Sequence, residues 1–421
     1  MRRYQWWIMG LCFAVTTFDG FDTQAIAFTG PAIAGDFAVD AGGLAPIITA
    51  GVAGMAAGAM LFGPIGDRYG RRLAVILATF LFGAFALATA FATSVTQLVI
   101  FRFLTGIGMG GATPNVLALV AEYVPSRVRA MMMMLAALGL PVGAIIGGQL
   151  AGTLIPHHGW QAVFVVGGVA PLLMLPMLWR WFPESPYFLA DRGQDEAVRR
   201  LLARVDPGRA PPAGSGFTLP EKPGRVGVAA LLTRELRRST LAIWATYFFN
   251  WIAWYALVLW LPTAFTSAGL PIERAPQVTI VLNGAALVLL LPVAWYLPRL
   301  PVRAMIVTLL AGGVATALAM AAIVDNWPLM FGLVALSGLV IGGPQLALNY
   351  LAAQIYPTAA RASGVGWAIG AGRIGTIAGG AIGGPLLVVG GAEGFFAALA
   401  IPLAVAALAA LLVRPAAAAP G

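Results

Sequence analysis

Long apolar runs separated by short polar segments constrain the fold of this chain more than any other feature. Hydrophobic residues make up 60% of the chain and charged residues 10%, against about 25% charged residues in an average soluble domain. A helix needs roughly 20 apolar residues to cross a membrane. Twelve runs approach that length, at approximately 5–30, 44–65, 73–93, 97–121, 130–154, 162–182, 240–266, 276–297, 303–323, 328–350, 362–386 and 392–413. The sequence therefore predicts an all-α membrane protein with twelve transmembrane helices.

The basic residues predict how these helices are oriented. All but three of the 25 lysines and arginines lie at chain ends and in loops that a cytoplasmic N-terminus would place inside; the exceptions are Arg102, Arg274 and Arg373. Because basic residues concentrate on the cytoplasmic side, we expect a multi-pass protein of the bacterial inner membrane with both termini cytoplasmic. The net charge of +9 then belongs beside the lipid bilayer. The basic residues form no aromatic-interleaved patch, and we expect no nucleic-acid partner.

A polar segment divides the runs into two sets of six. We predict an N-terminal six-helix bundle at 1–182, a cytoplasmic linker with short amphipathic helices at 183–238, and a C-terminal six-helix bundle with a short tail at 239–421. The two halves echo each other, since A-E-Y-V-P-S-R-V-R-A at 121–130 and A-Q-I-Y-P-T-A-A-R-A at 353–362 follow the fourth and tenth runs. Two parallel halves match a transporter architecture in which the substrate binds at the membrane midplane.

Two aspartates, Asp19 and Asp22, interrupt the first apolar run. A charged group at the centre of a bilayer costs at least ~2.5–3.5 kcal/mol on insertion scales, so such residues indicate function. Residues three apart share one helix face, and two neighbouring carboxylates in a low dielectric do not both ionise easily. This pattern predicts a proton site. Buried ion pairing that assembles helices is the alternative, and the sequence leaves open which aspartate carries the proton.

Two arginines and one glutamate also lie within or at the end of apolar runs. Arg373 follows Arg361 by 12 residues, hence by about 18 Å along a helix. Its guanidinium can bind a carboxylate bidentately, so we predict that it binds the substrate anion, with a structural pair to an aspartate as the alternative. Arg102 lies near the outer end of its run and could instead extend to the surface. Glu122 is a candidate for proton coupling, or a helix-end charge paired with a nearby arginine.

The seventh run carries aromatic and amide side chains at helical spacing. Tyr247, Asn250, Trp251, Trp254 and Tyr255 share one face of a helix. Aromatic residues with polar atoms suit stacking on an aromatic substrate, whereas a lipid-interface belt is the alternative. Other amides in the apolar runs are candidate substrate ligands or groups that join helices. They are Gln24, Asn115, Asn283, Gln345 and Asn349.

A glycine-rich loop, G-P-I-G-D-R-Y-G-R-R at 63–72, follows the second run. Its glycines permit tight turns, and Asp67 could cap a helix or pair with an arginine. Such a contact would hold two bundles in one conformation until they move. Arginines alone would be interpreted as residues that anchor the loop on the cytoplasmic side of the membrane. Their spacing with glycine and aspartate instead predicts a gate. The predicted gating residues are Gly63, Asp67, Arg68, Gly70, Arg71 and Arg72.

This loop resembles the signature loop of the major facilitator superfamily. R-F-L-T-G-I-G-M-G-G at 102–111 is similar to the second motif of that superfamily, which implies a role for Arg102 in proton transfer. P-E-S-P-Y-F-L at 183–189 matches a motif after the sixth helix in part. Five further segments resemble the aromatic acid:proton symporters, in particular transporters of hydroxybenzoates and phenylpropionates. These segments are D-G-F-D-T-Q-A (19–25), G-G-A-T-P-N (110–115), E-Y-V-P-S-R (122–127), L-I-P-H-H-G-W (154–160) and G-W-A-I-G-A-G-R-I-G (366–375).

The resemblance implies a major facilitator fold of two pseudo-symmetric six-helix bundles and proton-coupled uptake of a small aromatic carboxylate. Export of drugs or aromatic metabolites on the same fold is the alternative. The chain has no G-x-x-x-x-G-K-[ST] sequence for ATP, so protons are the expected coupling ion. The chain has one cysteine, and no histidine lies within an apolar run. We therefore expect no catalytic residue, no metal and no other cofactor. We expect a monomer. A membrane sensor or an intramembrane enzyme would need a signalling domain or a nucleophile constellation that the sequence lacks.

Overall fold

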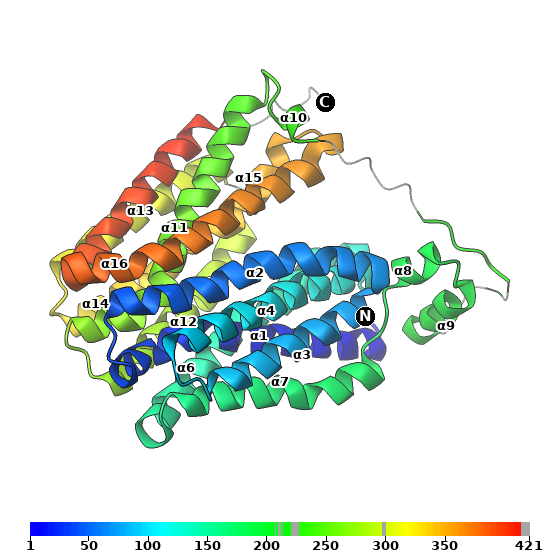
Figure 1. Cartoon of the computed structure of the whole chain (residues 1–421). Coiled ribbons are helices and arrows are strands. Elements are labelled where there is room, and N and C mark those ends of the chain that lie inside the picture. Colours follow the sequence, from blue (N-terminus) through cyan, green and yellow to red (C-terminus); the bar gives the residue numbers. More distant parts are fainter. Residues whose placement is uncertain (207, 209–211, 213, 220–226, 297–299, 414–421) are drawn as a thin grey trace. The chain divides into compact units, whose positions relative to one another are not determined.

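The computed structural model describes residues 1–206, 208, 212, 214–219, 227–296 and 300–413. Most of these residues are helical, and none forms a β-strand (Figure 1). This confirms the predicted all-α class. Three parts of the prediction lie wholly or in part outside the described residues. They are the linker at 183–238, the C-terminal tail and some of the basic residues that predict the orientation.

Sixteen α-helices follow one another along the described chain. They are α1 (Arg3–Asp36), α2 (Ala41–Tyr69), α3 (Arg71–Thr89), α4 (Val95–Tyr123), α5 (Arg129–Ala137), α6 (Gly139–His158), α7 (Gln161–Trp181), α8 (Pro186–Asp191), α9 (Asp195–Val205), α10 (Val228–Leu231), α11 (Arg237–Ser267), α12 (Ala275–Tyr296), α13 (Val302–Ala322), α14 (Trp327–Val340), α15 (Pro344–Ile355) and α16 (Thr358–Leu412).

Nine helical stretches of the described chain are long and apolar enough to cross a membrane: α2, α3, α4, α5 with α6, α7, α11, α13, α14 with α15, and α16. The predicted runs at 5–30 and 276–297 correspond to α1 and α12, which are not among the nine. The predicted runs at 362–386 and 392–413 both lie in α16. That helix is interrupted at Gly391, whose φ of 60° and ψ of −161° are not helical but are accessible to glycine.

Two predicted runs are each divided into two helices. The run at 130–154 forms α5 and α6, which meet at Leu138, and the run at 328–350 forms α14 and α15. The second break falls at Gly342 and Gly343, directly before Pro344. Glycine is a poor helix former, and proline supplies no backbone N–H and restricts the residue before it. Apolar composition alone does not reveal such breaks.

The chain divides into two compact units. The first comprises Met1–Ala25 and Ala50–Lys222, and the second comprises Ile26–Thr49 and Pro223–Gly421. The end of α1 and the start of α2 therefore belong to the second unit. At Gly384, on α16, a Cβ atom would collide with the backbone carbonyl of Ala41. The segment 26–49 is thus packed directly against the helices of the second unit.

Glycines allow helix backbones to touch in the first unit. A Cβ atom on Gly106 of α4 would collide with the backbone carbonyl of Gly51 on α2, and one on Gly143 of α6 would collide with that of Thr17 on α1. Small residues of this kind let membrane helices approach closely. These contacts fix Arg102 one turn before the α2–α4 crossing, and they fix the part of α1 that carries the two aspartates.

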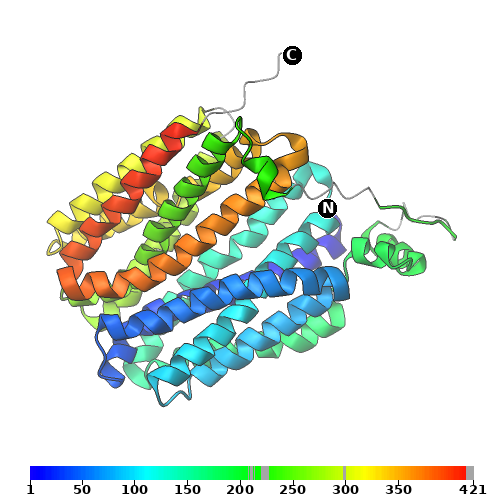
Figure 2. The same ribbon diagram turned by 45° about the horizontal axis from the view of Figure 1, so that its top comes forward.

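In the second unit, α11 and α16 lie side by side (Figures 1 and 2). Glycines again make the approach possible, because a Cβ atom on Gly375 or Gly379 would collide with the backbone carbonyl of Phe248 or Ile252. Arg373 stands on α16 at the beginning of this contact. The packing therefore brings it to the aromatic segment of α11.

Candidate functional site

A buried ion pair joins α1 and α4 of the first unit. Arg102 Nη1 donates to Asp22 Oδ1 at 3.1 Å, and Nη2 donates to the backbone carbonyl of Asp22 at 3.2 Å. Nη2 also lies 3.0 Å from Asp22 Oδ2, with the two side chains 2% and 0% exposed. The guanidinium carbon lies 5.4 Å from the ring centroid of Phe164 on α7, within the range of a cation–π contact. Arg102 therefore points into the unit and does not extend to the surface.

Asp19 has different surroundings, although it lies less than one turn from Asp22. Its carboxylate accepts a hydrogen bond from Thr23 Oγ1 at 3.2 Å, and its other oxygen accepts one from the hydroxyl of Thr113 on α4. Only 1% of Asp19 is exposed. Two threonine hydroxyls are thus among the groups that bind Asp19, and the Arg102 guanidinium binds Asp22.

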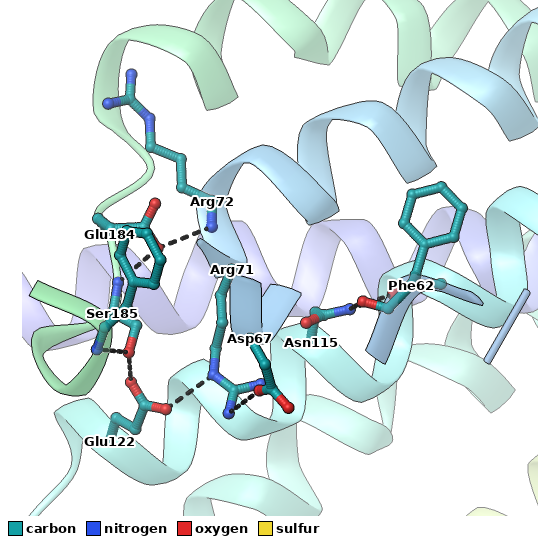
Figure 3. A network of polar contacts seen from close by, with 10 residues as sticks. Phe62, Asp67, Arg71, Arg72, Asn115, Glu122, Glu184 and Ser185 are labelled. Carbon is teal, nitrogen blue, oxygen red and sulfur yellow. Dashed lines mark hydrogen bonds and ion pairs between the residues drawn. The ribbon is translucent and has the colours of Figure 1, made fainter. Parts of the chain in front are cut away.

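The predicted gating loop lies in a network with Glu122 at the end of α4 (Figure 3). Arg71 Nε donates to Glu122 Oε1 at 2.8 Å, and Arg71 Nη2 lies 3.7 Å from Asp67 Oδ1. The hydroxyl of Ser185, in the segment between α7 and α8, donates to the other oxygen of Glu122. Glu122 therefore pairs with Arg71 rather than with the arginines that follow it, and its partners are separate from those of Asp19.

A second carboxylate, that of Glu184, binds the turn at Gly70. Glu184 Oε1 accepts hydrogen bonds from the backbone N–H groups of Arg72 at 3.2 Å and Ser185 at 2.8 Å. Gly70 has a φ of 102°, a conformation that favours glycine, and a Cβ atom there would collide with the Glu184 carboxylate. The backbone conformation therefore favours glycine at position 70, and a side chain there would also displace the Glu184 carboxylate.

Some predicted residues of this region lie outside the network. Gly63 has open space where a Cβ atom would stand, and the Arg68 guanidinium lies over the ring of Tyr69. Asn115 joins helices: its Nδ2 donates to the backbone carbonyl of Phe62 at 3.3 Å and to that of Gly111 at 2.9 Å (Figure 3). These two bonds agree with the helix-joining alternative, whereas Asn115 Oδ1 has no hydrogen-bond partner among the described residues. Substrate binding by Asn115 stays a prediction.

In the second unit, Arg373 meets the predicted aromatic face. Its guanidinium carbon lies 5.7 Å from the ring centroid of Trp251. Trp251 in turn lies 5.9 Å from Tyr255 and 6.2 Å from Tyr247, measured between ring centroids. Among the described residues of this unit no carboxylate forms an ion pair with Arg373. A partly exposed cation thus stands beside a row of aromatic rings.

The remaining predicted substrate-binding residues make different contacts. Tyr247 Oη donates to Asn349 Oδ1 at 2.8 Å, and Asn250 Nδ2 donates to the backbone carbonyl of Ile341 at 3.0 Å. Asn283 donates within its own helix to Thr279. Gln24 is 8% exposed on α1, in the first unit. Trp254 packs against Gly342.

Three buried polar atoms near the aromatic row have no hydrogen-bond partner among the described residues. They are Asn250 Oδ1, Trp251 Nε1 and Gln345 Nε2. Buried polar atoms are normally satisfied, so an unsatisfied one needs an explanation such as an absent ligand or water. Asn250 binds the carbonyl of Ile341, which lies four residues before Gln345, on the other side of the break between α14 and α15. The described residues contain no group of three or more His, Cys, Asp or Glu side chains that could hold a metal ion.

Four polar residues of these clusters were not predicted from the sequence: Thr23, Thr113, Glu184 and Ser185. Each lies inside one of the sequence motifs at 19–25, 110–115 or 183–189. The signal was therefore present, but a threonine or serine gives no sign in a sequence of which carboxylate it will face.

A buried carboxylate beside a buried arginine, within helices packed through glycines, is typical of membrane transporters that couple ions to solutes. Residues 12–324 match the Major Facilitator Superfamily. The chain belongs to this superfamily of transporters, which are not enzymes.

Relatives of known name cover nearly the whole chain. A gallate transporter of Pseudomonas putida is 38% identical over 98% of this chain and 92% of its own length. The 4-hydroxybenzoate transporter PcaK of Pseudomonas aeruginosa is 38% identical over 98% and 93%. A 3-(3-hydroxy-phenyl)propionate transporter of Escherichia coli is 35% identical over 95% and 92%. The crystal structure of a D-xylose-proton symporter has a TM-score of 0.74 at 18% identity, with 97% of each chain covered; this likeness shows the fold. The resemblance to transporters of aromatic acids is confirmed.

Proposed function

We propose that this protein is a twelve-helix secondary active transporter that imports a small aromatic carboxylate together with protons. The observation that carries the proposal is Arg373 beside the Trp251 ring. The guanidinium would bind the substrate carboxylate, and the aromatic row would stack on its ring. Asn250 Oδ1 and Gln345 Nε2 would bind its polar substituents. Relatives named for gallate, 4-hydroxybenzoate and 3-(3-hydroxy-phenyl)propionate support this substrate class.

Asp19 would carry the proton and Asp22 would hold Arg102. A threonine hydroxyl can donate to an ionised carboxylate and, after rotation, accept from a protonated one. The Thr23 and Thr113 hydroxyls therefore suit Asp19 in both protonation states. Protonation of Asp22 would instead leave the Arg102 charge buried and uncompensated, which is costly.

The loop network of Asp67, Arg71 and Glu122 would act in gating by holding together the start of α3, the end of α4 and the segment after α7. We further propose that the protein works as a monomer in the bacterial inner membrane with both termini cytoplasmic. In this proposal protons are the coupling ion and no cofactor takes part.

Uptake of labelled 4-hydroxybenzoate into proteoliposomes tests the proposal. An inward proton gradient should drive accumulation above the equilibrium level. Asp19→Asn resembles a permanently protonated side chain, so it should abolish gradient-driven accumulation and retain exchange of internal for external substrate. Asp325→Asn, a change at an exposed position outside the candidate site, should behave as the wild type. Full accumulation by Asp19→Asn would refute the assignment to Asp19, and gradient-driven efflux alone would favour the export alternative.

A further inference from the structure

A cavity of about 650 Å³ lies at the end of the first unit where α1 begins and α7 ends. The start of α3 and the amphipathic helix α9 complete its lining. The N-terminus, α8 and α9 lie at this end in Figure 1. Its volume is within the range of small-molecule sites. Asp19, Asp22 and Arg102 do not line it, so it is separate from the buried ion pair.

The lining of this cavity is strongly basic. Four arginines contribute to it: Arg72, Arg180, Arg200 and Arg204. Glu184 is the single carboxylate that contributes, among the described residues. Its carboxylate already accepts hydrogen bonds from the backbone N–H groups of Arg72 and Ser185. An excess of positive charge therefore remains in the cavity.

The arginines differ in how far their charge is already compensated. Arg200 Nε lies 3.1 Å from Glu196 Oε1. Hydrogen bonds from Arg199 and Arg200 lower the pKa of Glu196 to about 2, so this neighbour stays ionised. No ion pair to Arg180 or Arg204 occurs in the part of the chain that the structure describes. Arg204 hydrogen-bonds the neutral Tyr4 hydroxyl, and the Arg72 guanidinium donates to the backbone carbonyl of Trp179. Neither contact neutralises the charge, so Arg72, Arg180 and Arg204 each keep a positive charge that can attract an anion.

The cavity lies at the ends of two candidate membrane-spanning helices. Both α3, which begins at Arg71, and α7, which ends at Trp181, are long and apolar enough to span. The amphipathic α9 buries Val198 to 4% exposure and packs Leu201 against the apolar core of the unit. Amphipathic helices with a basic face commonly lie at the headgroup level.

An apolar track leads from the cavity along α7. Trp181, in the cavity lining, is 48% exposed, and its ring meets that of Trp7 edge to face at 6.0 Å. Met177 and Leu173 stand one and two turns earlier on the same face, at 38% and 72% exposure. Tryptophan favours the membrane–water boundary. The track begins at the basic cavity and continues into the bilayer.

We propose that this cavity binds an anionic phospholipid. The phosphate occupies the space between Arg180 and Arg204, and an acyl chain lies along Trp181, Met177 and Leu173. The apolar track favours a lipid over a free phosphate, because a soluble anion would use only the arginines. Basic pockets between membrane helices are suited to such headgroups.

Native mass spectrometry of the full chain in detergent tests this site with phosphatidylglycerol, with phosphatidylcholine and with sn-glycerol 3-phosphate as a competitor. The wild type should retain phosphatidylglycerol in preference to phosphatidylcholine. The double variant Arg180→Gln/Arg204→Gln should weaken phosphatidylglycerol binding by roughly thirtyfold. Arg180→Lys/Arg204→Lys should retain most of the binding, since lysine also binds phosphate as a point charge.

A matched control removes the same charge from exposed arginines outside the cavity, Arg127 and Arg129. Arg127→Gln/Arg129→Gln should leave the lipid preference within a factor of about two, because distant exposed charges are screened. Equal losses in both glutamine variants would overturn the site, as would equal retention of the two lipids by the wild type. Displacement of the lipid by equimolar sn-glycerol 3-phosphate would overturn the role of the apolar track.

Discussion

Breaking the buried pair of Asp22 and Arg102 should destabilise the protein strongly. The two side chains are 0% and 2% exposed and are joined by two guanidinium–carboxylate contacts of 3.0–3.1 Å. Arg102→Leu would leave the carboxylate buried without its cation, and Asp22→Leu would leave the guanidinium without its anion. Removal of one partner of a buried ion pair typically costs about 3–5 kcal/mol of unfolding free energy.

Removing both partners should cost much less than the two separate losses. Replacement of a buried pair by apolar residues is often neutral or stabilising by about 1–4 kcal/mol, since no uncompensated charge remains. If the sites were independent, the double variant Asp22→Leu/Arg102→Leu would lose roughly 6–10 kcal/mol. The structure instead predicts that the double variant is at least as stable as either single variant.

The assay is a double-mutant cycle on purified protein in detergent, with unfolding followed by denaturant titration. Asp325→Leu, at an exposed position, controls for the loss of a carboxylate in general and should change the unfolding free energy by less than about 1 kcal/mol. Additive losses for the pair would refute the argument that Asp22 is held chiefly by Arg102. The same variants should be unable to accumulate substrate, whatever their stability.

Three further predictions concern single contacts. Thr113→Val removes a hydroxyl from Asp19 and should slow proton-driven uptake roughly tenfold, whereas Thr113→Ser should not; equal rates would contradict the proposed hydroxyl pair. Trp251→Ala should raise the KM for aromatic acids about three- to tenfold, with Trp251→Phe close to the wild type; an unchanged KM would exclude stacking there. Glu122→Gln removes the nearer of the two carboxylates beside Arg71 and leaves only that of Asp67 at 3.7 Å. It should lower the unfolding free energy by about 1–3 kcal/mol, measured beside the exposed Glu235→Gln, which should have no effect.

The sequence was sufficient for the all-α class and for the charged residues of the candidate site. Charge in an apolar run is costly, so Asp19, Asp22, Arg102 and Arg373 could be singled out without a structure. Which of these residues pair with one another could not be predicted. The ion pair of Asp22 and Arg102 depends on where the glycines let α4 approach its neighbours. The pairing of Glu122 with Arg71 could not be predicted either, because Arg71 is 51 positions away along the chain.

Apolar composition also did not predict helix breaks that lie within an apolar run. Gly342, Gly343 and Pro344 interrupt a run that reads as continuous, and Gly391 bends α16 within one. Hydropathy measures transfer to lipid and carries no information on backbone dihedral angles. The division of the first two helices between the units depends on contacts with helices much later in the sequence, which no local pattern records.

That division has a consequence for biosynthesis. The segment Ile26–Thr49 belongs with α11 and α16, but the ribosome reaches Arg237, where α11 begins, almost 190 residues after Thr49. At typical rates of translation this interval is roughly 10–40 s. The hairpin of the first two helices must therefore wait in the bilayer with a face uncovered until its partners have been inserted. A chain truncated before α11 would expose that face permanently, and quality-control proteases could recognise the incomplete protein by it.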